Sequence, residues 1–558
     1  MGTVTRVNGP LVEVEGLTGA AMFELVGLGP HGLPGEIVSL RGDRATVQAY
    51  EYTGGLSPGH SVEHRGSPLS ALLGPHLLGG VFDGLLRPLT GAGMWLDPAT
   101  PVPAHSARVW RFTPLVEEGR AAGPGTAIGS VESAGSPPYL VLSPGGEVSA
   151  IRPAGIYSAD AQVAVVGGAE VTLVRRRPVR QALPYVSRLE SVIPFTTGQR
   201  VIDLLLPVPL GGTVAVPGGF GTGKTVLLQQ IAKWCEADVV VYIGCGERGN
   251  EMADVVAELG ELTDPRTGGR LGERTVVIAN TSNMPMMARE ASIYTGVTVA
   301  EHFRDMGYDV VVIADSTSRW AEARREFASR SGALPAEEGY PADLASALAA
   351  FYERAGRVTT LGGATGSVTI IGAVSPPGGD LTEPVTTQTE RFVRALWALD
   401  RDLAYARHYP AVSWGGSFSR DADVLMAGSP DGAARRARVA GLLDEAGRLA
   451  TLAELVGAAT LPARERVVLL GGRLLREGFL RQSSLSLLDA FCRPGRTAML
   501  ADALLAVIER CQDLVDHGIP VASIEERDFS PILRAKDTAE EEIVARRDTV
   551  LDDLETLR

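Results

Sequence analysis

Apolar and polar residues alternate along the first part of the chain, and glycine-containing turns separate the alternating runs. Alternation with a period of two is typical of half-buried β-strands, and four such runs lie at residues 4–7, 11–14, 36–40 and 45–50. Because several short strands joined by tight turns readily close on themselves, we expect residues 1–68 to form a small β-barrel.

The pattern changes in the middle of the chain, where near-continuous apolar runs alternate with segments of helical period. These runs lie at residues 239–243, 275–279, 310–314 and 368–371. Such runs are typical of parallel strands that are covered on both faces, so we expect an α/β domain over residues 185–425. Residues 69–112 are interpreted as its start, and the glycine- and proline-rich residues 113–184 as an inserted β-rich domain.

Helical periodicity dominates the last part of the chain. Four segments carry it, at residues 433–461, 463–480, 497–517 and 539–557. Because helical periodicity dominates these segments, we expect residues 426–558 to form a C-terminal helical bundle.

Length, charge and cysteine content restrict the classes of protein to which this chain can belong. A length of 558 residues predicts several domains, and the net charge of −14 argues against a broad nucleic-acid-binding surface. The basic cluster of Arg175, Arg176, Arg177 and Arg180 is therefore interpreted as a solvated edge. Four cysteines without paired spacing indicate reduced thiols, and prolines and glycines interrupt the longest uncharged stretches, so no membrane span is expected.

Residues 218–225 carry the strongest chemical signal, because they match the phosphate-binding pattern G-x-x-x-x-G-K-[ST]. Glycines let backbone N–H groups surround phosphate oxygens, Lys224 places a charge on the β and γ phosphates, and Thr225 offers a hydroxyl to Mg²⁺. A β-prone run precedes the loop and a helical pattern follows it, which argues against a glycine-rich turn without function. The residues expected to contact nucleotide are Gly218, Gly219, Phe220, Gly221, Thr222, Gly223, Lys224, Thr225 and Val226.

Two acidic positions follow predicted strands of the same domain. Asp315 ends the apolar run at 310–314, which is where a carboxylate can hold Mg²⁺ beside a phosphate loop. Glu247 follows the run at 239–243 and could polarise the water that attacks the γ phosphate. Glu251 could reach the magnesium shell through a water molecule. The alternative for Glu247 and Glu251 is an acidic loop that caps a helix.

Several longer motifs resemble one family, the catalytic A subunit of the V-type and archaeal-type rotary ATPases. The resemblance covers essentially the whole chain. Besides the phosphate loop, the matching segments are Gly-Cys-Gly-Glu-Arg-Gly-Asn-Glu-Met (244–252), Ala-Asp-Ser-Thr-Ser-Arg-Trp-Ala-Glu (314–322), Glu-Glu-Gly-Tyr-Pro-Ala (337–342), Phe-Tyr-Glu-Arg-Ala-Gly-Arg-Val (351–358) and Val-Ser-Pro-Pro-Gly-Gly-Asp (374–380). It implies a RecA-like fold for the α/β domain and ATP, ADP and Mg²⁺ as ligands.

The resemblance also assigns residue roles by position. It implies that Glu247 activates water, that Arg248 and Arg319 lie near the phosphates, and that Tyr409 stacks on adenine. Phe418 would complete the adenine pocket, with core packing as the alternative for both aromatic residues. The chain departs from the family pattern at 386–390 and 414–418, which concerns loops and the adenine side rather than the phosphate chemistry.

The partners implied by the resemblance are the other subunits of a rotary complex. A non-catalytic B subunit would alternate with this chain in a hexameric ring and supply an arginine finger. Central-shaft and peripheral-stalk subunits would link the ring to a membrane sector that carries protons or sodium ions. The chain would lie peripherally, on the cytoplasmic side of the membrane, and bind no nucleic acid. The alternatives are a hexameric RNA or DNA motor, a secretion-system ATPase with the same core, and a non-catalytic scaffold protein of the ring, against which the intact Lys224, Thr225 and Glu247 argue.

Overall fold

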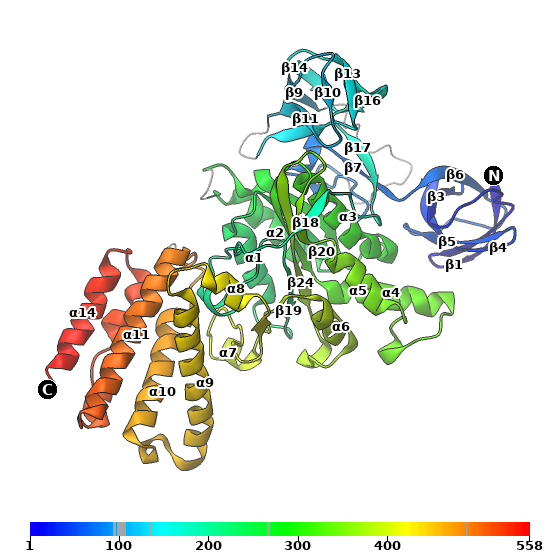
Figure 1. The fold of residues 1–558 in the computed structure, drawn as a ribbon. Coiled ribbons are helices and arrows are strands. Elements are labelled where there is room, and N and C mark those ends of the chain that lie inside the picture. The colour runs from blue at the N-terminus through cyan, green and yellow to red at the C-terminus, as the bar shows by residue number, and fades with distance from the viewer. Residues whose placement is uncertain (93–95, 97–107, 133–136, 265–267, 487, 558) are drawn as a thin grey trace. The chain divides into compact units, whose positions relative to one another are not determined.

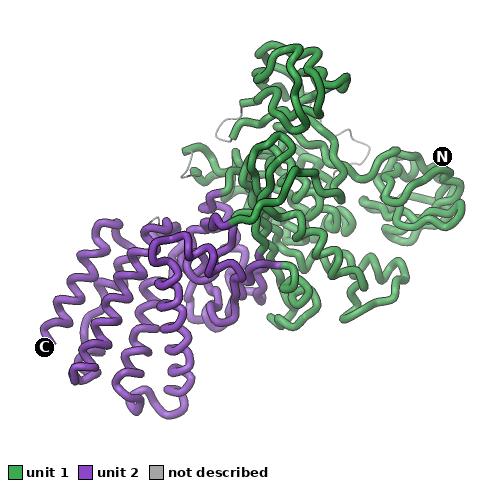
Figure 2. The backbone as a smooth tube through the Cα atoms, in the orientation of Figure 1, with its two compact units in different colours: residues 1–191, 210–213, 237–392 green, residues 192–209, 214–236, 393–558 purple. Residues whose placement is uncertain are grey.

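The computed structural model describes residues 1–92, 96, 108–132, 137–264, 268–486 and 488–557. These residues form two compact units, shown in different colours in Figure 2. Unit 1 comprises residues 1–191, 210–213 and 237–392, and unit 2 comprises residues 192–209, 214–236 and 393–558.

The N-terminal part of unit 1 is a closed barrel of six antiparallel strands (Figure 1). In spatial order, the strands are β1 (Gly2–Asn8), β2 (Leu11–Glu15), β5 (Arg44–Ala49), β4 (Leu33–Arg41), β3 (Glu24–Leu28) and β6 (Ser61–Pro68). Alternate residues such as Val12, Val14 and Val47 point inward and are fully buried, whereas their neighbours face outward. The predicted barrel is therefore confirmed, and closure leaves it without an unpaired edge.

A β-rich region follows the barrel and consists of two four-stranded sheets. One has the order β10 (Ala121–Ala122), β13 (Gly146–Ile151), β15 (Gln162–Val166), β16 (Ala169–Thr172), and the other β12 (Tyr139–Leu142), β11 (Ala127–Val131), β9 (Val109–Pro114), β14 (Gly155–Ser158). A short ribbon of β7 (Ser70–Leu73) and β17 (Arg175–Pro178) pairs the chain before and after this region.

The expectation of a solvated edge at the basic cluster is wrong for Arg180. Its guanidinium donates to Glu290 at 2.7 Å and to Glu36 at 3.2 Å, and both carboxylates are nearly inaccessible to water. Arg175 likewise turns inward and donates to the carbonyl of Leu142 at 2.7 Å. Sequence could not reveal this, because the acidic partners of Arg180 lie more than 100 residues away.

The centre of unit 1 is a parallel sheet with the neighbour order β24 (Thr365–Val374), β22 (Asp309–Asp315), β20 (Val239–Cys245), β21 (Thr275–Asn280), β8 (Val81–Phe82). The antiparallel strands β18 (Ser187–Leu189) and β23 (Gly356–Thr359) extend it beyond β24. The helices that follow its strands are α2 (Gly249–Glu261), α3 (Met286–Arg304), α4 (Thr317–Ser331), α5 (Leu344–Tyr352) and α6 (Pro384–Phe392). Residues of β20 and β22 are buried on both faces, as the uninterrupted apolar runs predict.

Unit 2 contains the strand that precedes the phosphate loop and the C-terminal helices. Strand β19 (Thr213–Pro217), whose first residue belongs to unit 1, pairs in parallel with β25 (Ala395–Leu396), which pairs with β26 (Phe418–Ser419). The remaining α-helices are α1 (Lys224–Trp234), α7 (Arg401–Tyr405), α8 (Ala422–Ala427), α9 (Gly432–Val456), α10 (Ala463–Leu475), α11 (Pro494–Asp516), α12 (Val521–Glu525), α13 (Ser530–Leu533) and α14 (Glu542–Glu555).

Helices α9, α10, α11 and α14 lie side by side in Figure 1, which confirms the predicted helical C-terminal part. The helix predicted to reach residue 461 ends at Val456, because Gly457 adopts a φ of +87° that an α-helix cannot continue through. Helix α11 starts three residues earlier than predicted, with Pro494 at its first turn, where the missing N–H is harmless. Among the described helices, none is long and apolar enough to cross a membrane.

Candidate functional site

The phosphate loop lies in unit 2, between the end of β19 at Pro217 and the start of α1 at Lys224. Gly221 and Gly223 have φ values of +80° and +82°, a left-handed conformation that aims successive N–H groups into one concavity. The Lys224 ammonium donates to the carbonyl of Gly218 at 3.0 Å and thus folds back over the loop. Together with the N-terminus of an 11-residue helix, this arrangement suits an anionic ligand.

A cavity of about 660 Å³ adjoins the loop within unit 2. Gly223 and Val226 line one side of it and Tyr409 another. A β-carbon added to Gly223 would lie 3.1 Å from Cε1 of Tyr409, so the aromatic ring packs directly against the phosphate loop. An aromatic ring beside such a loop is positioned to stack on a nucleotide base.

Sequence reasoning missed most of the cavity wall. The wall includes Arg407, Arg481, Gln482, Leu485 and Lys536, which come from segments far apart in the chain. The only sequence signal was the serine-rich break between two helical patterns at 483–486, and nothing tied that break to Tyr409. In the structure the two are joined, because the N–H of Gln482 donates to the carbonyl of Tyr409 at 2.7 Å.

Phe418 lies in β26, opposite Leu396 of β25, and is half-buried. The guanidinium of Arg420 lies 5.4 Å from its ring centroid. Phe418 is not among the residues that line the 660 Å³ cavity, whereas Tyr409 is.

The acidic candidates lie in unit 1, at the carboxyl ends of two adjacent parallel strands. Gly244 of β20 is in register with Asp315 of β22, and Glu247 follows two residues after β20 ends. Asp315 is buried and its Oδ2 accepts a hydrogen bond from the hydroxyl of Tyr242 at 3.2 Å. Ligands of open α/β sheets bind at this edge, so both carboxylates are at the expected place.

The surroundings of Glu247 favour its neutral form. Burial raises the pKa of Glu247 to about 7, with further contributions from the charge of Asp315 and from a hydrogen bond and charge at Glu251, while Arg319 opposes the rise. A carboxyl group with a pKa near neutrality can both accept and release a proton under physiological conditions. Strong shifts of this kind concentrate at functional sites, although structural ion pairs also cause them.

The two arginine candidates lie on helices that begin at this edge. Arg248 precedes α2, has a side chain that is 71% exposed and approaches Glu251 at 3.7 Å. Arg319, in the first turn of α4, donates to Glu322 at 2.9 Å. Gly246 makes the close approach of α4 possible, because a β-carbon there would lie 2.8 Å from Cβ of Arg319.

Each unit carries an oxygen donor of the kind that Mg²⁺ prefers. Asp315 supplies a buried carboxylate, and Thr225 supplies a hydroxyl in the first turn of α1. Over the described part of the chain, no group of three or more His, Cys, Asp or Glu side chains forms a metal cluster. Mg²⁺ in nucleotide sites needs no such cage, because one or two carboxylates and the substrate phosphates hold it.

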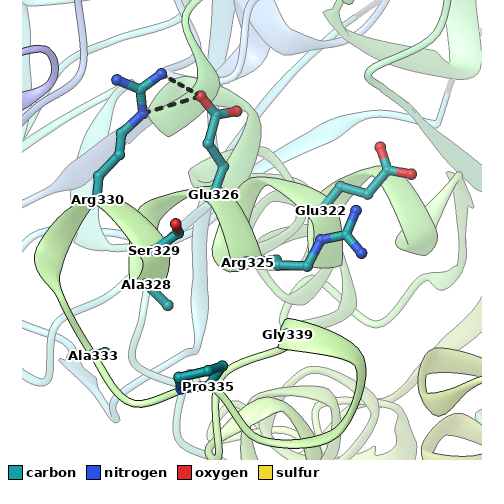
Figure 3. Close-up of a pocket in the computed structure, with 9 residues that line it drawn as sticks. All are labelled: Glu322, Arg325, Glu326, Ala328, Ser329, Arg330, Ala333, Pro335 and Gly339. Atoms are coloured by element: carbon teal, nitrogen blue, oxygen red, sulfur yellow. Dashed lines mark hydrogen bonds and ion pairs between the residues drawn. The ribbon is translucent and has the colours of Figure 1, made fainter.

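A second hollow, of about 830 Å³, lies further along α4 (Figure 3). Within it Arg330 donates to Glu326 at 2.7 Å, and Glu322, which also lines the hollow, is the partner of Arg319. None of the predicted site residues lines this hollow, whereas Gly223, Val226 and Tyr409 all line the cavity beside the phosphate loop.

Comparison with known proteins gives three matching family models. Residues 4–66 match the beta-barrel domain of the ATP synthase alpha/beta family, residues 198–419 match the nucleotide-binding domain of the same family, and residues 429–523 match the C-terminal domain of V and A type ATP synthase.

Curated relatives match over nearly their full length. A V-type ATP synthase alpha chain from Anaeromyxobacter sp. (strain K) is 52% identical over 538 residues, which cover 94% of this chain and 93% of that protein. The A subunit of the A-type ATP synthase from Thermococcus onnurineus (strain NA1) is 47% identical over 544 residues, with 94% and 93% covered. Among solved structures, the type III secretion ATPase EscN from enteropathogenic E. coli shares the fold, with a TM-score of 0.66, 22% identity, and coverage of 91% of this chain and 100% of that one.

Proposed function

The chain belongs to the ATP synthase alpha/beta family, in its V-type and A-type branch, and on that basis we propose that its own side chains form the catalytic nucleotide site. Proteins of this kind hydrolyse or synthesise ATP in step with ion transport. The observation that carries the assignment is that one chain holds both an intact phosphate loop and, at Glu247, a carboxyl group whose pKa is raised to about 7.

The phosphate loop holds the triphosphate. Backbone N–H groups of residues 218–223 surround the phosphate oxygens, and Lys224 exchanges its bond to the Gly218 carbonyl for one to the β and γ phosphates. Thr225 and Asp315 would hold Mg²⁺, which would neutralise charge on the phosphate oxygens. Tyr409 stacks on adenine, whereas Phe418, which does not line the cavity, is assigned no contact with the base.

Glu247 moves the proton. It accepts a proton from the water molecule whose oxygen bonds to the γ phosphorus, while the bond between that phosphorus and the bridging oxygen of ADP breaks. The products are ADP and inorganic phosphate, and Glu247 returns its proton to solvent or phosphate. Arg248 and Arg319 stabilise the charge on the transferring group, and Glu251 would reach the magnesium shell through a water molecule. In the direction of synthesis the same groups act in reverse.

The remaining partners are proposed by analogy with the family. A B subunit contributes an arginine finger to the site, shaft and stalk subunits connect the ring to a membrane ion carrier, and the ring lies on the cytoplasmic side. Both arginines at the site already face carboxylates of this chain, Glu251 for Arg248 and Glu322 for Arg319, which supports a need for a further cation. An arginine supplied in trans accelerates phosphoryl transfer by ~10³–10⁵ in comparable systems.

The test is to replace Lys224 with Met in the full-length chain and measure ATP binding by calorimetry. We expect ATP affinity to fall strongly, because the loop then loses its only side-chain charge, while the melting temperature remains unchanged. A Lys233→Met variant removes a lysine from the other end of α1 and serves as the matched control. Undiminished ATP binding in Lys224→Met would show that the loop is not the phosphate site.

A further inference from the structure

One wall of the cavity beside Tyr409 is a loop rather than a helix or strand. This wall loop, residues 481–486, follows the helical segment that ends at Leu480 and supplies Arg481, Gln482 and Leu485 to the lining. A loop can present a binding surface reliably only when its backbone groups are held by the rest of the protein. The wall loop therefore needs partners elsewhere in unit 2.

A single fully buried arginine contacts both the start of this loop and the residue pair before it. The guanidinium of Arg200 donates from Nε to the carbonyl of Phe479 at 2.6 Å and from Nη2 to the carbonyl of Arg481 at 3.0 Å, just before and at the start of the loop. Its Nη1 donates to Oδ1 of Asp489 at 2.6 Å, and neither side chain has any exposed surface. All these residues belong to unit 2.

Asp489 and Gln482 complete the arrangement. The second carboxylate oxygen of Asp489 accepts a hydrogen bond from the N–H of Ser483 at 2.7 Å, so the ion pair clamps both the start and the middle of the loop. The side chain of Gln482 accepts from the N–H of Arg200 at 3.0 Å and donates to the carbonyl of Gly198 at 2.8 Å. Its backbone N–H holds the carbonyl of Tyr409. The clamp thus links the wall loop to the aromatic ring across the cavity.

We propose that the buried Arg200–Asp489 pair is a positioning device for the nucleotide base: it sets the wall loop and Tyr409 at the spacing that a base requires. This inference rests on the proposed function of the cavity. A buried ion pair adds little net stability compared with packed apolar residues, so its presence in a fully enclosed position is better explained by the geometry it fixes. Arg200 and Asp489 act through the loop and do not themselves bind the phosphates.

Two ligands separate base recognition from phosphate recognition. MgATP carries both groups, whereas magnesium tripolyphosphate carries the phosphates alone. Both ligands are titrated by calorimetry into the full-length unmodified chain and into its Asp489→Asn and Arg200→Lys variants. Arg200→Lys keeps the positive charge but lacks the planar guanidinium group that makes several hydrogen bonds at once. Asp502→Asn is the matched control, because Asp502 pairs with Arg435 at 2.7 Å on the exposed surface of the same unit. Melting temperatures are recorded for every variant.

We expect both variants to bind ATP about 10- to 100-fold more weakly and to bind tripolyphosphate with unchanged affinity. The same range is typical when a residue that orients a metal ligand is replaced. Asp502→Asn should bind both ligands like the unmodified chain. Unchanged ATP affinity, or equal losses for ATP and tripolyphosphate, in Arg200→Lys would overturn the inference but leave the proposed function intact. Equal affinity of the unmodified chain for ATP and tripolyphosphate would instead remove the base site from the proposed function, and this inference with it.

Discussion

Glu247 should make the folded chain less stable above neutral pH than a neutral side chain at the same position would. Its pKa is raised from 4.5 to about 7, so the folded state favours the protonated carboxyl group. Below pH 4.5 the group is protonated in both the folded and the unfolded state, and the stabilisation from the raised pKa is fully present. As the pH rises to 7 and beyond, that stabilisation is lost, because the ionised carboxylate faces burial, Asp315 and Glu251.

The magnitude follows from the pKa difference. A difference of roughly 2.5 pKa units corresponds to about 3.4 kcal/mol, at about 1.36 kcal/mol per unit. Because Glu247 is only partly buried, solvent screens the interaction, and we expect about 1–2 kcal/mol. Glu247→Gln, which is isosteric and always neutral, should therefore be more stable than the unmodified chain by this amount at pH 8 and equally stable at pH 4.5.

The assay is thermal unfolding of the nucleotide-free chain between pH 4.5 and pH 8. One kcal/mol raises the melting temperature of a domain of 150–250 residues by about 2–4 °C, so the predicted difference is measurable. Glu261→Gln, at the exposed end of α2, controls for the loss of one negative charge. If the advantage of Glu247→Gln is absent, or is the same at pH 4.5 and pH 8, the pKa of Glu247 is not raised in the folded chain.

Three further predictions concern catalysis and packing. The chain alone should hydrolyse ATP ~10³-fold or more slowly than the assembled ring, and equal rates would exclude an arginine supplied in trans. Tyr409→Ala should raise KM for ATP by about 5- to 150-fold, from the ~1–3 kcal/mol that base stacking contributes, with kcat little changed; an unchanged KM would place the base elsewhere. Gly246→Ala should lower kcat, because a β-carbon at this position would lie 2.8 Å from Cβ of Arg319 and displace that arginine, and because the φ of +77° is strained for alanine. An unchanged kcat would show that catalysis does not depend on the position of Arg319.

The sequence predicts the parts of this molecule that depend on local pattern. The alternating runs specify the barrel, the buried runs specify β20, β21, β22 and β24, and Gly221 and Gly223 take the left-handed conformations that the phosphate loop requires. The wall of the cavity could not be predicted in this way. Arg200 and Asp489 are 289 residues apart, and only the folded chain brings the two into contact.

The same limit explains the error at Arg180. A cluster of arginines in an acidic chain suggests a solvated surface, but charge along the sequence does not reveal which acidic residues the fold brings nearby. Glu36 lies in the barrel and Glu290 in α3, and both carboxylates are buried where they pair with Arg180. The raised pKa of Glu247 is also a product of the fold, because register between β20 and β22 is what sets Asp315 beside it.

Whether Glu247 takes the proton from water is decided by the turnover of a Glu247→Gln complex that still binds ATP. Phosphate release is followed after one equivalent of radiolabelled ATP is mixed with the purified complex, and retained nucleotide is counted on the protein. We predict that ATP stays bound and intact, because an amide at position 247 cannot accept that proton. Phosphate release at the rate of the unmodified complex would show that Glu247 is not the catalytic base.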